Sequence, residues 1–458
     1  MRARREGRRA KTRERRARRL WAILWALSVN AHSSAAEDGG ALEADAQGAT
    51  QALGTAPASS VVVAAPLRAD QPAPKGDQLA LRLASLVAGR IGASARAYPQ
   101  TALLGAARAL AGRAGALVYL QIEVSKGDIR ATVDVYPSMA NAWDRIRNPL
   151  PSPIHHAFAS VKIDAEVRSF LTPLVLEQAT VDRAHHDEQD VLAAACGDVN
   201  GDGGNEIVLV SRDRTVMGRV RGGRFLVERA APWSDLAGRA PVPMREPLAG
   251  AVIIPGAVAV GSTERGSVSL TPDFDTHVPL PGVPAWGGGG IVCLTPQPSA
   301  GSFDGAPFDC SSTRDVKPAM AVPAPRFDAF SADIVANAGG DASTIVAVRE
   351  PNGKLKLKMR DAPPYAPDGA FGAQLAVGDL DQDGAPEIAV SADAQDDAVE
   401  IWTWPSEAAP MQPRLHLAAP AGVRALAVCP PEEHGEPTLV AVVGSEVWLV
   451  RAGRGGAP

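Results

Sequence analysis

One eleven-residue pattern occurs twice in the chain, and it constrains the fold more than any other feature of the sequence. Both copies read Gly-Asp-x-Asp/Asn-x-Asp-Gly-x-x-Glu-Ile, beginning at Gly197 and at Gly378. Oxygen-bearing side chains at alternate positions converge on one hard cation when a glycine permits a sharp turn between them. The pattern therefore predicts two metal-binding loops. Ca²⁺ suits such loops because it accepts about six to eight oxygen ligands in a tolerant geometry.

The predicted ligands come from the same positions of both copies. Loop 1 offers Asp198, Asn200, Asp202, Glu206 and the backbone carbonyl of Gly204. Loop 2 offers Asp379, Asp381, Asp383, Glu387 and the backbone carbonyl of Ala385. Because loop 2 has one more carboxylate, we expect it to bind Ca²⁺ more tightly than loop 1. The alternative is two acidic turns that bind no ion.

An EF-hand loop begins with similar residues, but two features exclude an EF-hand here. Its twelfth position carries glutamate, whereas Leu209 and Val390 occupy that position. The residues after each loop, IVLVS and IAVS, indicate strands rather than an exiting helix. A calcium loop that joins two strands resembles the FG-GAP/VCBS repeat of integrin-α-like β-propellers, and the resemblance implies bound calcium.

A third copy keeps the strand residues and loses the ligands. Residues 426–442 align with the second copy without a gap. Pro430, His434 and Thr438 then take the places of three acidic ligands. We expect a turn without metal at this place.

The spacing of the copies predicts the architecture. Propeller blades of four strands span about 40–50 residues, and strand starts recur near residues 191, 250, 290, 331, 374 and 424. The excess of Gly (44) and Pro (38) also favours many turns. We therefore expect a mainly β fold with a six-bladed β-propeller over residues 188–455. Seven blades is the alternative, if residues 167–181 supply another blade or part of one.

Residues 60–137 predict a small α/β domain before the propeller. A Val-rich strand at 60–67 precedes a helix that Asp77 can cap and that extends to residue 91. A second helix at 101–115 and a hairpin over 116–137 follow. This order resembles the N-terminal α/β domain of TolB and related periplasmic proteins, in which a propeller comes next. We expect residues 37–59 to form a flexible linker and residues 138–187 to form a connector.

The first 36 residues resemble a secretory signal. A basic run is followed by the apolar residues 20–29 and then by small residues. We expect the protein to be exported to the periplasm or the exterior after cleavage of residues 1–36, or to keep this segment as an anchor. The apolar stretch is too short for a spanning helix, which needs about 20 residues, so we expect none in the mature chain.

The four cysteines are compatible with export, where disulfides persist. They allow three pairings, and we favour a local bridge between Cys293 and Cys310, which bracket a segment rich in Gly, Pro and Ser. The alternative is four buried free thiols.

Charge and motifs limit the function classes. The net charge of −5 includes eleven basic and two acidic residues within residues 1–36, so the remainder carries −14. Such an acidic body argues against nucleic-acid binding. We find no nucleophile elbow, phosphate-binding loop or zinc-protease motif. We therefore expect a non-enzymatic binding protein with a protein or glycan partner. The alternative is a carbohydrate-active hydrolase or lyase with its pocket in the propeller channel.

Overall fold

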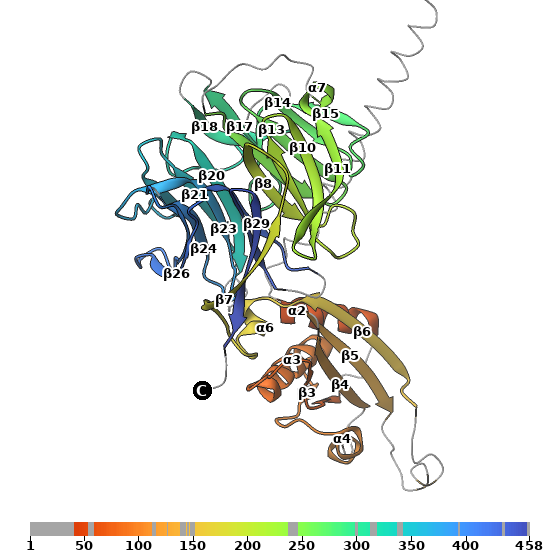
Figure 1. The fold of residues 1–458 in the computed structure, drawn as a ribbon. Helices are drawn as coiled ribbons and strands as arrows, with labels where there is room; N and C mark the ends of the chain where they lie inside the picture. The colour runs from red at the N-terminus through yellow and green to blue at the C-terminus, as the bar shows by residue number, and fades with distance from the viewer. Residues whose placement is uncertain are drawn as a thin grey trace, which may run out of the picture.

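The computed structural model describes residues 41–53, 59–111, 116–125, 127–137, 143, 146, 152–236, 246–297, 301–311, 318–336, 342–392, 394–432 and 436–455. They form two regions, a smaller N-terminal domain and a larger domain built of β-sheets (Figure 1). Among the described residues, no helix combines the length and apolar character needed to cross a membrane. The expected signal, residues 1–36, lies outside the described residues.

The N-terminal domain is a six-stranded sheet with helices on both faces (Figure 1). Its strands lie in the order β3-β1-β4-β5-β6, and β2 pairs with β4. The strands are β1 (Ser60–Ala64), β2 (Arg68–Ala69), β3 (Arg96–Ala97), β4 (Ala116–Ser125), β5 (Asp128–Pro137) and β6 (His155–Lys162). The helices are α2 (Ala41–Leu53), α3 (Gly76–Ile91), α4 (Leu104–Ala111) and α6 (Ala165–Arg168).

Side chains of the central strands point alternately to the two faces of the sheet, and both faces are apolar and packed against helices. Val62 and Val118 face α2 and α3, whereas Val63 and Leu117 face α4. Successive side chains of a strand point to opposite faces, and both faces of β1 and β4 are buried. The predicted strand, helices and hairpin of residues 60–137 are therefore present. Asp77 is not the helix cap, because α3 begins after Lys75 and the Asp77 carboxylate accepts a hydrogen bond from Thr101 instead.

Two expectations for the flanking segments are wrong. Within the expected linker 37–59, residues 41–53 form α2, whose Leu42, Ala46 and Ala49 are fully buried. Their spacing of three and four places all three on one helix face, against the sheet. The expected connector 138–187 supplies β6 to the N-terminal sheet and β7 (Leu174–His185) to the larger domain.

The larger domain consists of one eight-stranded sheet and four antiparallel sheets of three or four strands, arranged around a common axis. In the eight-stranded sheet, β7 joins the first strands of the domain to the last ones. The first four strands are β8 (Val191–Gly197), β9 (Glu206–Ser211), β10 (Arg214–Arg221) and β11 (Arg224–Pro232), followed by the short helix α7 (Trp233–Leu236). The second sheet contains β12 (Ala249–Ile254), β13 (Ala257–Ser262), β14 (Gly266–Leu270) and β15 (His277–Leu280). The third contains β16 (Val283–Trp286), β17 (Ile291–Gln297), β18 (Ser302–Asp309) and β19 (Arg326–Phe327).

The remaining strands continue this order. The next sheet contains β20 (Ala329–Ala336), β21 (Ala342–Arg349) and β22 (Leu355–Met359). It is followed by β23 (Phe371–Gly378), β24 (Glu387–Ala392), β25 (Ala398–Thr403) and β26 (Gln412–Ala418). The last strands are β27 (Val423–Cys429), β28 (Thr438–Val443) and β29 (Glu446–Arg454), with β7 paired to β29.

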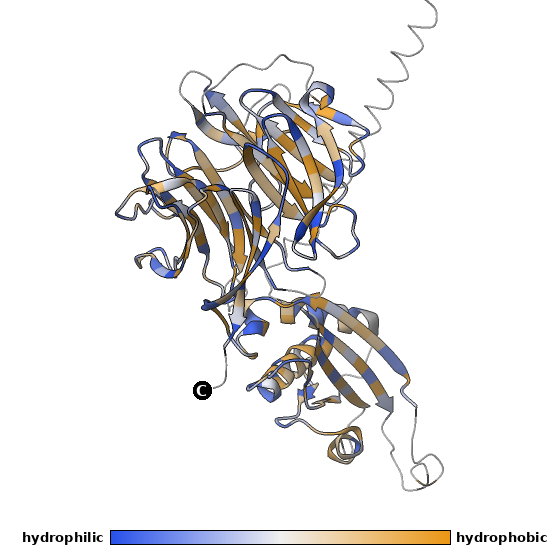
Figure 2. Cartoon of the chain, in the orientation of Figure 1, coloured by the Kyte–Doolittle hydropathy of each residue, from blue (hydrophilic) through white to orange (hydrophobic). Residues whose placement is uncertain are grey.

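The innermost strands form a closed ring. Strands β8, β12, β16, β20, β23 and β27 each contact the next, and β27 contacts β8. The domain is therefore a β-propeller. A ring of six inner strands is the arrangement expected of a six-bladed propeller, and the number of blades remains a prediction. The expected start near residue 290 falls on the second strand of its sheet, because the inner strand is the short segment Val283–Trp286. Figure 2 shows mostly apolar strands and more hydrophilic loops in the propeller.

The first and last parts of the propeller are joined twice. Strand β7 precedes β8 in the sequence and pairs antiparallel with β29. A disulfide between Cys196 and Cys429 also links β8 to β27, with a Cα–Cα distance of 4.8 Å. The predicted bridge between Cys293 and Cys310 is confirmed, with a Cα–Cα distance of 5.0 Å. The alternative of four free thiols is wrong.

Candidate functional site

Loop 2 connects β23 to β24 and brings three predicted ligands together. Oxygen atoms of Asp379, Asp381 and Glu387 all lie within 4.8 Å of one another. Glu387 is fully buried and Asp381 is 2% exposed. Asp379 is half-buried. Three carboxylates at this separation form a donor set suited to a hard cation such as Ca²⁺.

Backbone amides hold these carboxylates in place. The amides of Asp383 and Gly384 donate to the two oxygens of Asp379 at 3.1 and 3.2 Å. The Leu380 amide donates to Oε2 of Glu387 at 2.7 Å. The turn requires positive φ at Gln382 (56°) and Gly384 (85°), and only glycine adopts such angles without strain.

Burial raises the pKa of each of the three clustered carboxyl groups. It is the largest cause of the raised pKa of Asp379, which reaches about 8, and neighbouring carboxylates add to the shift. Burial and the Asp383 charge likewise raise the pKa of Asp381 to about 6. The pKa of Glu387 is raised mainly by burial and then by the three aspartates. A bound dication would favour the charged form of each carboxylate.

The other two predicted ligands of loop 2 lie at its margin. Asp383 is exposed and is not among the three clustered carboxylates. Its Oδ1 accepts a hydrogen bond from the Ala385 amide at 2.7 Å. One basic side chain approaches the cluster from β26, where Arg414 donates to Oδ2 of Asp381 at 3.3 Å.

Loop 1 connects β8 to β9 and repeats the backbone arrangement. The amides of Gly201 and Gly203 donate to the two oxygens of Asp198 at 2.7 and 2.8 Å. The Val199 amide donates to Oε2 of Glu206 at 2.9 Å. Gly201 (φ 76°) and Gly203 (φ 83°) occupy the positions of Gln382 and Gly384. The two loops therefore have the same turn, as the sequence predicted.

An arginine occupies the ligand cluster of loop 1. The Nη2 group of Arg219 donates to both carboxylate oxygens of Asp202 at 2.8 and 2.7 Å and to the Gly204 carbonyl at 3.4 Å. Its Nε donates to Oε1 of Glu206 at 3.0 Å. Asn200 also donates to that oxygen at 3.0 Å. The Arg219 guanidinium is the first cause of the lowered pKa of Asp202.

The third copy shows a related contact, and its acidic residue at the ligand positions is Glu432, aligned with Asp381. Thr438 stands where the other copies carry glutamate, and its hydroxyl accepts a hydrogen bond from Nε of Arg451 at 3.1 Å. Asn205 of loop 1 donates to the Pro430 carbonyl at 2.8 Å, which links the two turns. His434 lies outside the described residues.

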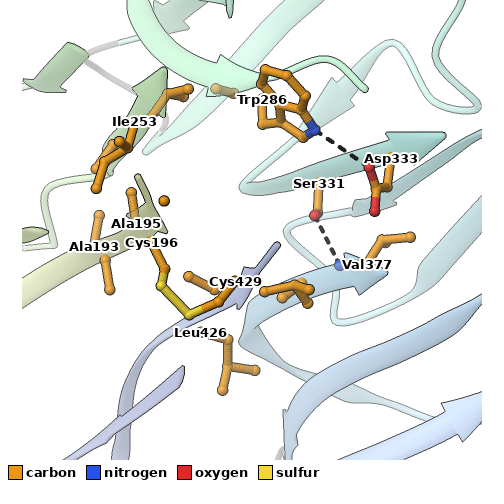
Figure 3. A pocket seen from close by; sticks show the side chains of 18 of the residues that line it. Ala193, Ala195, Cys196, Ile253, Trp286, Ser331, Asp333, Val377, Leu426 and Cys429 are labelled. Carbon is orange, nitrogen blue, oxygen red and sulfur yellow. Dashed lines mark hydrogen bonds between the residues drawn. A yellow bond between two sulfur atoms is a disulfide. The ribbon is translucent and has the colours of Figure 1, made fainter. Parts of the chain in front are cut away.

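A cavity of about 1740 Å³ follows the propeller axis, and both loops line it. Asp198 and Asp379 line it together with residues 160–165 of the N-terminal domain, and Gln382 of loop 2 donates to the Ile163 carbonyl at 3.4 Å. Its wall combines polar and apolar groups, with Ala193, Ile253 and Leu426 among its apolar side chains (Figure 3). Loops 1 and 2 are therefore part of the rim of the channel near the N-terminal domain.

One polar pair in this channel was not predicted from the sequence. The indole Nε1 of Trp286 donates to Oδ1 of Asp333 at 3.4 Å (Figure 3). Burial raises the pKa of Asp333 to about 6. These residues belong to adjacent inner strands, β16 and β20, and no sequence motif relates them.

Comparisons with known proteins agree with the repeat. The FG-GAP repeat family matches residues 371–404, which contain all of loop 2. A comparison with curated proteins gives no match.

Solved structures similar to this chain include BBS1N in complex with ARL6DN, at 12% identity and a TM-score of 0.34, covering 62% of this chain and 98% of that one. They also include TolB from Acinetobacter baumannii, at 11% identity and a TM-score of 0.30, covering 88% and 95%. A DUF4623 family protein from Bacteroides eggerthii is 11% identical, with a TM-score of 0.38 and coverage of 71% and 82%. The chain thus contains an FG-GAP repeat within a β-propeller.

Proposed function

We propose that this protein is an exported, non-enzymatic binding protein whose β-propeller is stiffened by calcium and presents its loops to a protein or glycan partner. The observation that carries the proposal is the buried cluster of Asp379, Asp381 and Glu387 inside the matched FG-GAP repeat. Without a cation these carboxylates repel one another at short range in a site of low polarity. Calcium would remove that repulsion and hold β23 and β24 together at the channel rim.

Two disulfides support the exported location. Disulfides persist in oxidising compartments and are rare in the cytosol. All four cysteines are paired, and the basic and apolar segments of residues 1–36 fit a secretory signal. Export also brings the protein into contact with millimolar calcium, the range in which extracellular calcium modules with dissociation constants of about 10⁻⁴–10⁻³ M bind their ion.

The contacts of three acids that line the channel, Asp328, Asp333 and Asp379, support binding rather than catalysis. A glycoside hydrolase needs two free carboxyl groups facing one substrate bond. Asp328 is paired with Arg349 by an ion pair, and Asp333 accepts the Trp286 hydrogen bond. Asp379 belongs to the predicted metal cluster.

The test is calcium-dependent capture. The purified full chain is immobilised and exposed to a glycan array and to an envelope extract, in calcium and in chelator. Asp381→Asn is the matched variant, because it removes one charge of the cluster at constant size. We expect a partner retained by the wild type in calcium and lost in chelator and in Asp381→Asn. Calcium-independent retention would contradict the stiffening role, and release of reducing sugar from array glycans would favour the hydrolase.

A further inference from the structure

We infer that only loop 2 is a calcium site and that Arg219 takes the place of the ion in loop 1. The inference rests on the proposed calcium binding at loop 2 and specifies it. One residue position determines whether a loop binds calcium or holds an arginine in its place. This position lies on the next strand, opposite the glutamate that ends each loop. Of the two loops that match the ligand pattern, one then binds a calcium ion.

The pairing of strands defines this position. In loop 2, Glu387 is paired with Thr403 across β24 and β25. In loop 1, Ile207 is paired with Gly218, so the next residue of β10, Arg219, stands opposite Glu206. Arg219 and Thr403 are therefore equivalent positions in two copies of the same unit.

The Arg219 guanidinium occupies the centre of the donor set. It contacts Asp202, Gly204 and Glu206, which are three of the five predicted ligands of loop 1. The side chains of Glu206 and Arg219 are 1% and 18% exposed. Calcium binding there would place a dication against the half-buried guanidinium or would expel the arginine from its carboxylates. The first alternative brings positive charges together, and the second breaks the ion pair that Arg219 makes with the buried Glu206 carboxylate.

Loop 2 has no such cation at the equivalent position. The Thr403 hydroxyl is neutral and donates to Oε1 of Glu387 at 2.8 Å. Arg414, from the neighbouring strand β26, donates to Asp381 at 3.3 Å and to the Thr403 hydroxyl at 3.0 Å, but it makes no hydrogen bond to Asp379 or Glu387. Its Nε donates to Glu177 at 2.6 Å. In loop 2 one of four carboxylates, Asp381, is thus paired with an arginine, whereas in loop 1 two of three carboxylates, Asp202 and Glu206, are paired with Arg219.

The third copy has an arginine at the same position, but a threonine replaces the glutamate. Leu439 is paired with Val450, so Arg451 stands opposite Thr438. Here the acidic ligand is absent and the arginine remains, bound to the threonine hydroxyl. The residue that ends the loop and the residue opposite it are glutamate and threonine in loop 2, and threonine and arginine in the third copy. Only the combination in loop 2 leaves acidic ligands without an arginine at this position.

Calcium stoichiometry tests the inference directly. Isothermal titration and equilibrium dialysis of the full chain should give one ion for the wild type. Arg219→Thr, which copies loop 2, should give two ions, and Thr403→Arg, which copies loop 1, should give none. The double exchange should restore one ion, now in loop 1. Arg221→Thr is the control, because Arg221 is an exposed residue of the same strand, and this variant should still bind one ion.

The outcomes separate this inference from the proposed function. Two ions in the wild type, or one ion in Arg219→Thr, would overturn the role of Arg219 and leave calcium binding intact. No ion in the wild type would overturn both. Arg219→Gln retains a hydrogen-bond donor without the charge and should also give two ions, so the test does not depend on the folding of one variant. Thr403→Arg alters loop 2 alone and gives an independent reading.

Discussion

Arg168 and Gln382 join the two domains through a buried hydrogen bond, in which Nε of Arg168 donates to Oε1 of Gln382 at 3.1 Å. Arg168 belongs to α6 at the edge of the N-terminal domain and is 5% exposed. Gln382 belongs to loop 2, between two predicted metal ligands, and its Nε2 donates to the Ile163 carbonyl at 3.4 Å. The candidate metal loop therefore also forms a contact between the propeller and the α/β domain.

Replacing Gln382 should loosen this contact. Gln382→Ala leaves the buried Arg168 guanidinium without its main acceptor, and such a loss costs about 2–4 kcal/mol. We expect a lower free energy of unfolding in denaturant and faster proteolytic separation of the two domains.

Two variants control for other causes. Gln382→Gly relaxes the positive φ of 56° while removing the same hydrogen bonds, so it should also loosen the contact. Gln78→Ala, on the exposed surface of α3, should have no effect. Wild-type proteolysis rates in Gln382→Gly would show that backbone strain, rather than the link to Arg168, explains the alanine variant.

A buried carboxylate in α2 should make stability depend on pH. Asp45 is fully buried in the N-terminal core, and burial raises its pKa to about 8. Since the unfolded value is about 3.9, the unfolded chain releases this proton first. Stability from this group is complete below about pH 4 and falls as the pH rises towards 8. Asp45→Asn should flatten that decline and be the more stable protein at pH 8, by a few kcal/mol at most.

Denaturant unfolding at several pH values measures the effect. Glu43→Gln is a suitable control, because Glu43 is on the same helix and pairs with Arg90 at the surface. It should keep the wild-type pH profile. A profile of Asp45→Asn that parallels the wild type between pH 4 and 8 would contradict the prediction.

The sequence predicts what is local and repeated. The two acidic loops, the hairpin of residues 116–137 and five of the six inner-strand starts follow from short patterns. The short strand Val283–Trp286 is missed, because it contains Pro284 and lies between glycines, which resembles a loop. Helix α2 is missed because its alanines carry a weak apolar pattern and Asp45 interrupts it.

The contacts that decide the chemistry are not local. Arg219 lies thirteen residues beyond Glu206, and only the register of β9 with β10 places it opposite that residue. Comparison of the residues aligned with Thr403 in each copy could have revealed it. Gln382 looks like a spacer in the motif, and its link to Arg168 spans 214 positions of the chain.

Calcium should stabilise the protein through loop 2 alone. A ligand that binds only the folded state at about a hundredfold excess over its dissociation constant adds about 2.7 kcal/mol. We expect chelator to lower the midpoint of thermal unfolding in the wild type. Asp381→Asn should abolish this response, whereas Asp202→Asn should retain it, because Asp202 is paired with Arg219. An equal loss of response in both variants would show that calcium uses both loops.

The disulfide that closes the propeller ring should contribute more stability than the local one. Cys196 and Cys429 are separated by 233 positions, and Cys293 and Cys310 by 17. In the chain-entropy description, cross-links that close loops of these sizes stabilise by about 5 and about 3 kcal/mol. Cys196→Ala combined with Cys429→Ala should therefore lower the free energy of unfolding more than the corresponding pair at 293 and 310. Both pairs are buried, so cavity costs are comparable, and each double variant is compared with the reduced wild type.

The ring bridge also joins β8 to β27 beside loop 1, so its loss should speed hydrogen exchange in β7, β8 and β29. Equal destabilisation by the two double variants, with unchanged exchange in these strands, would mean that pairing of β7 with β29 closes the ring without help from the disulfide.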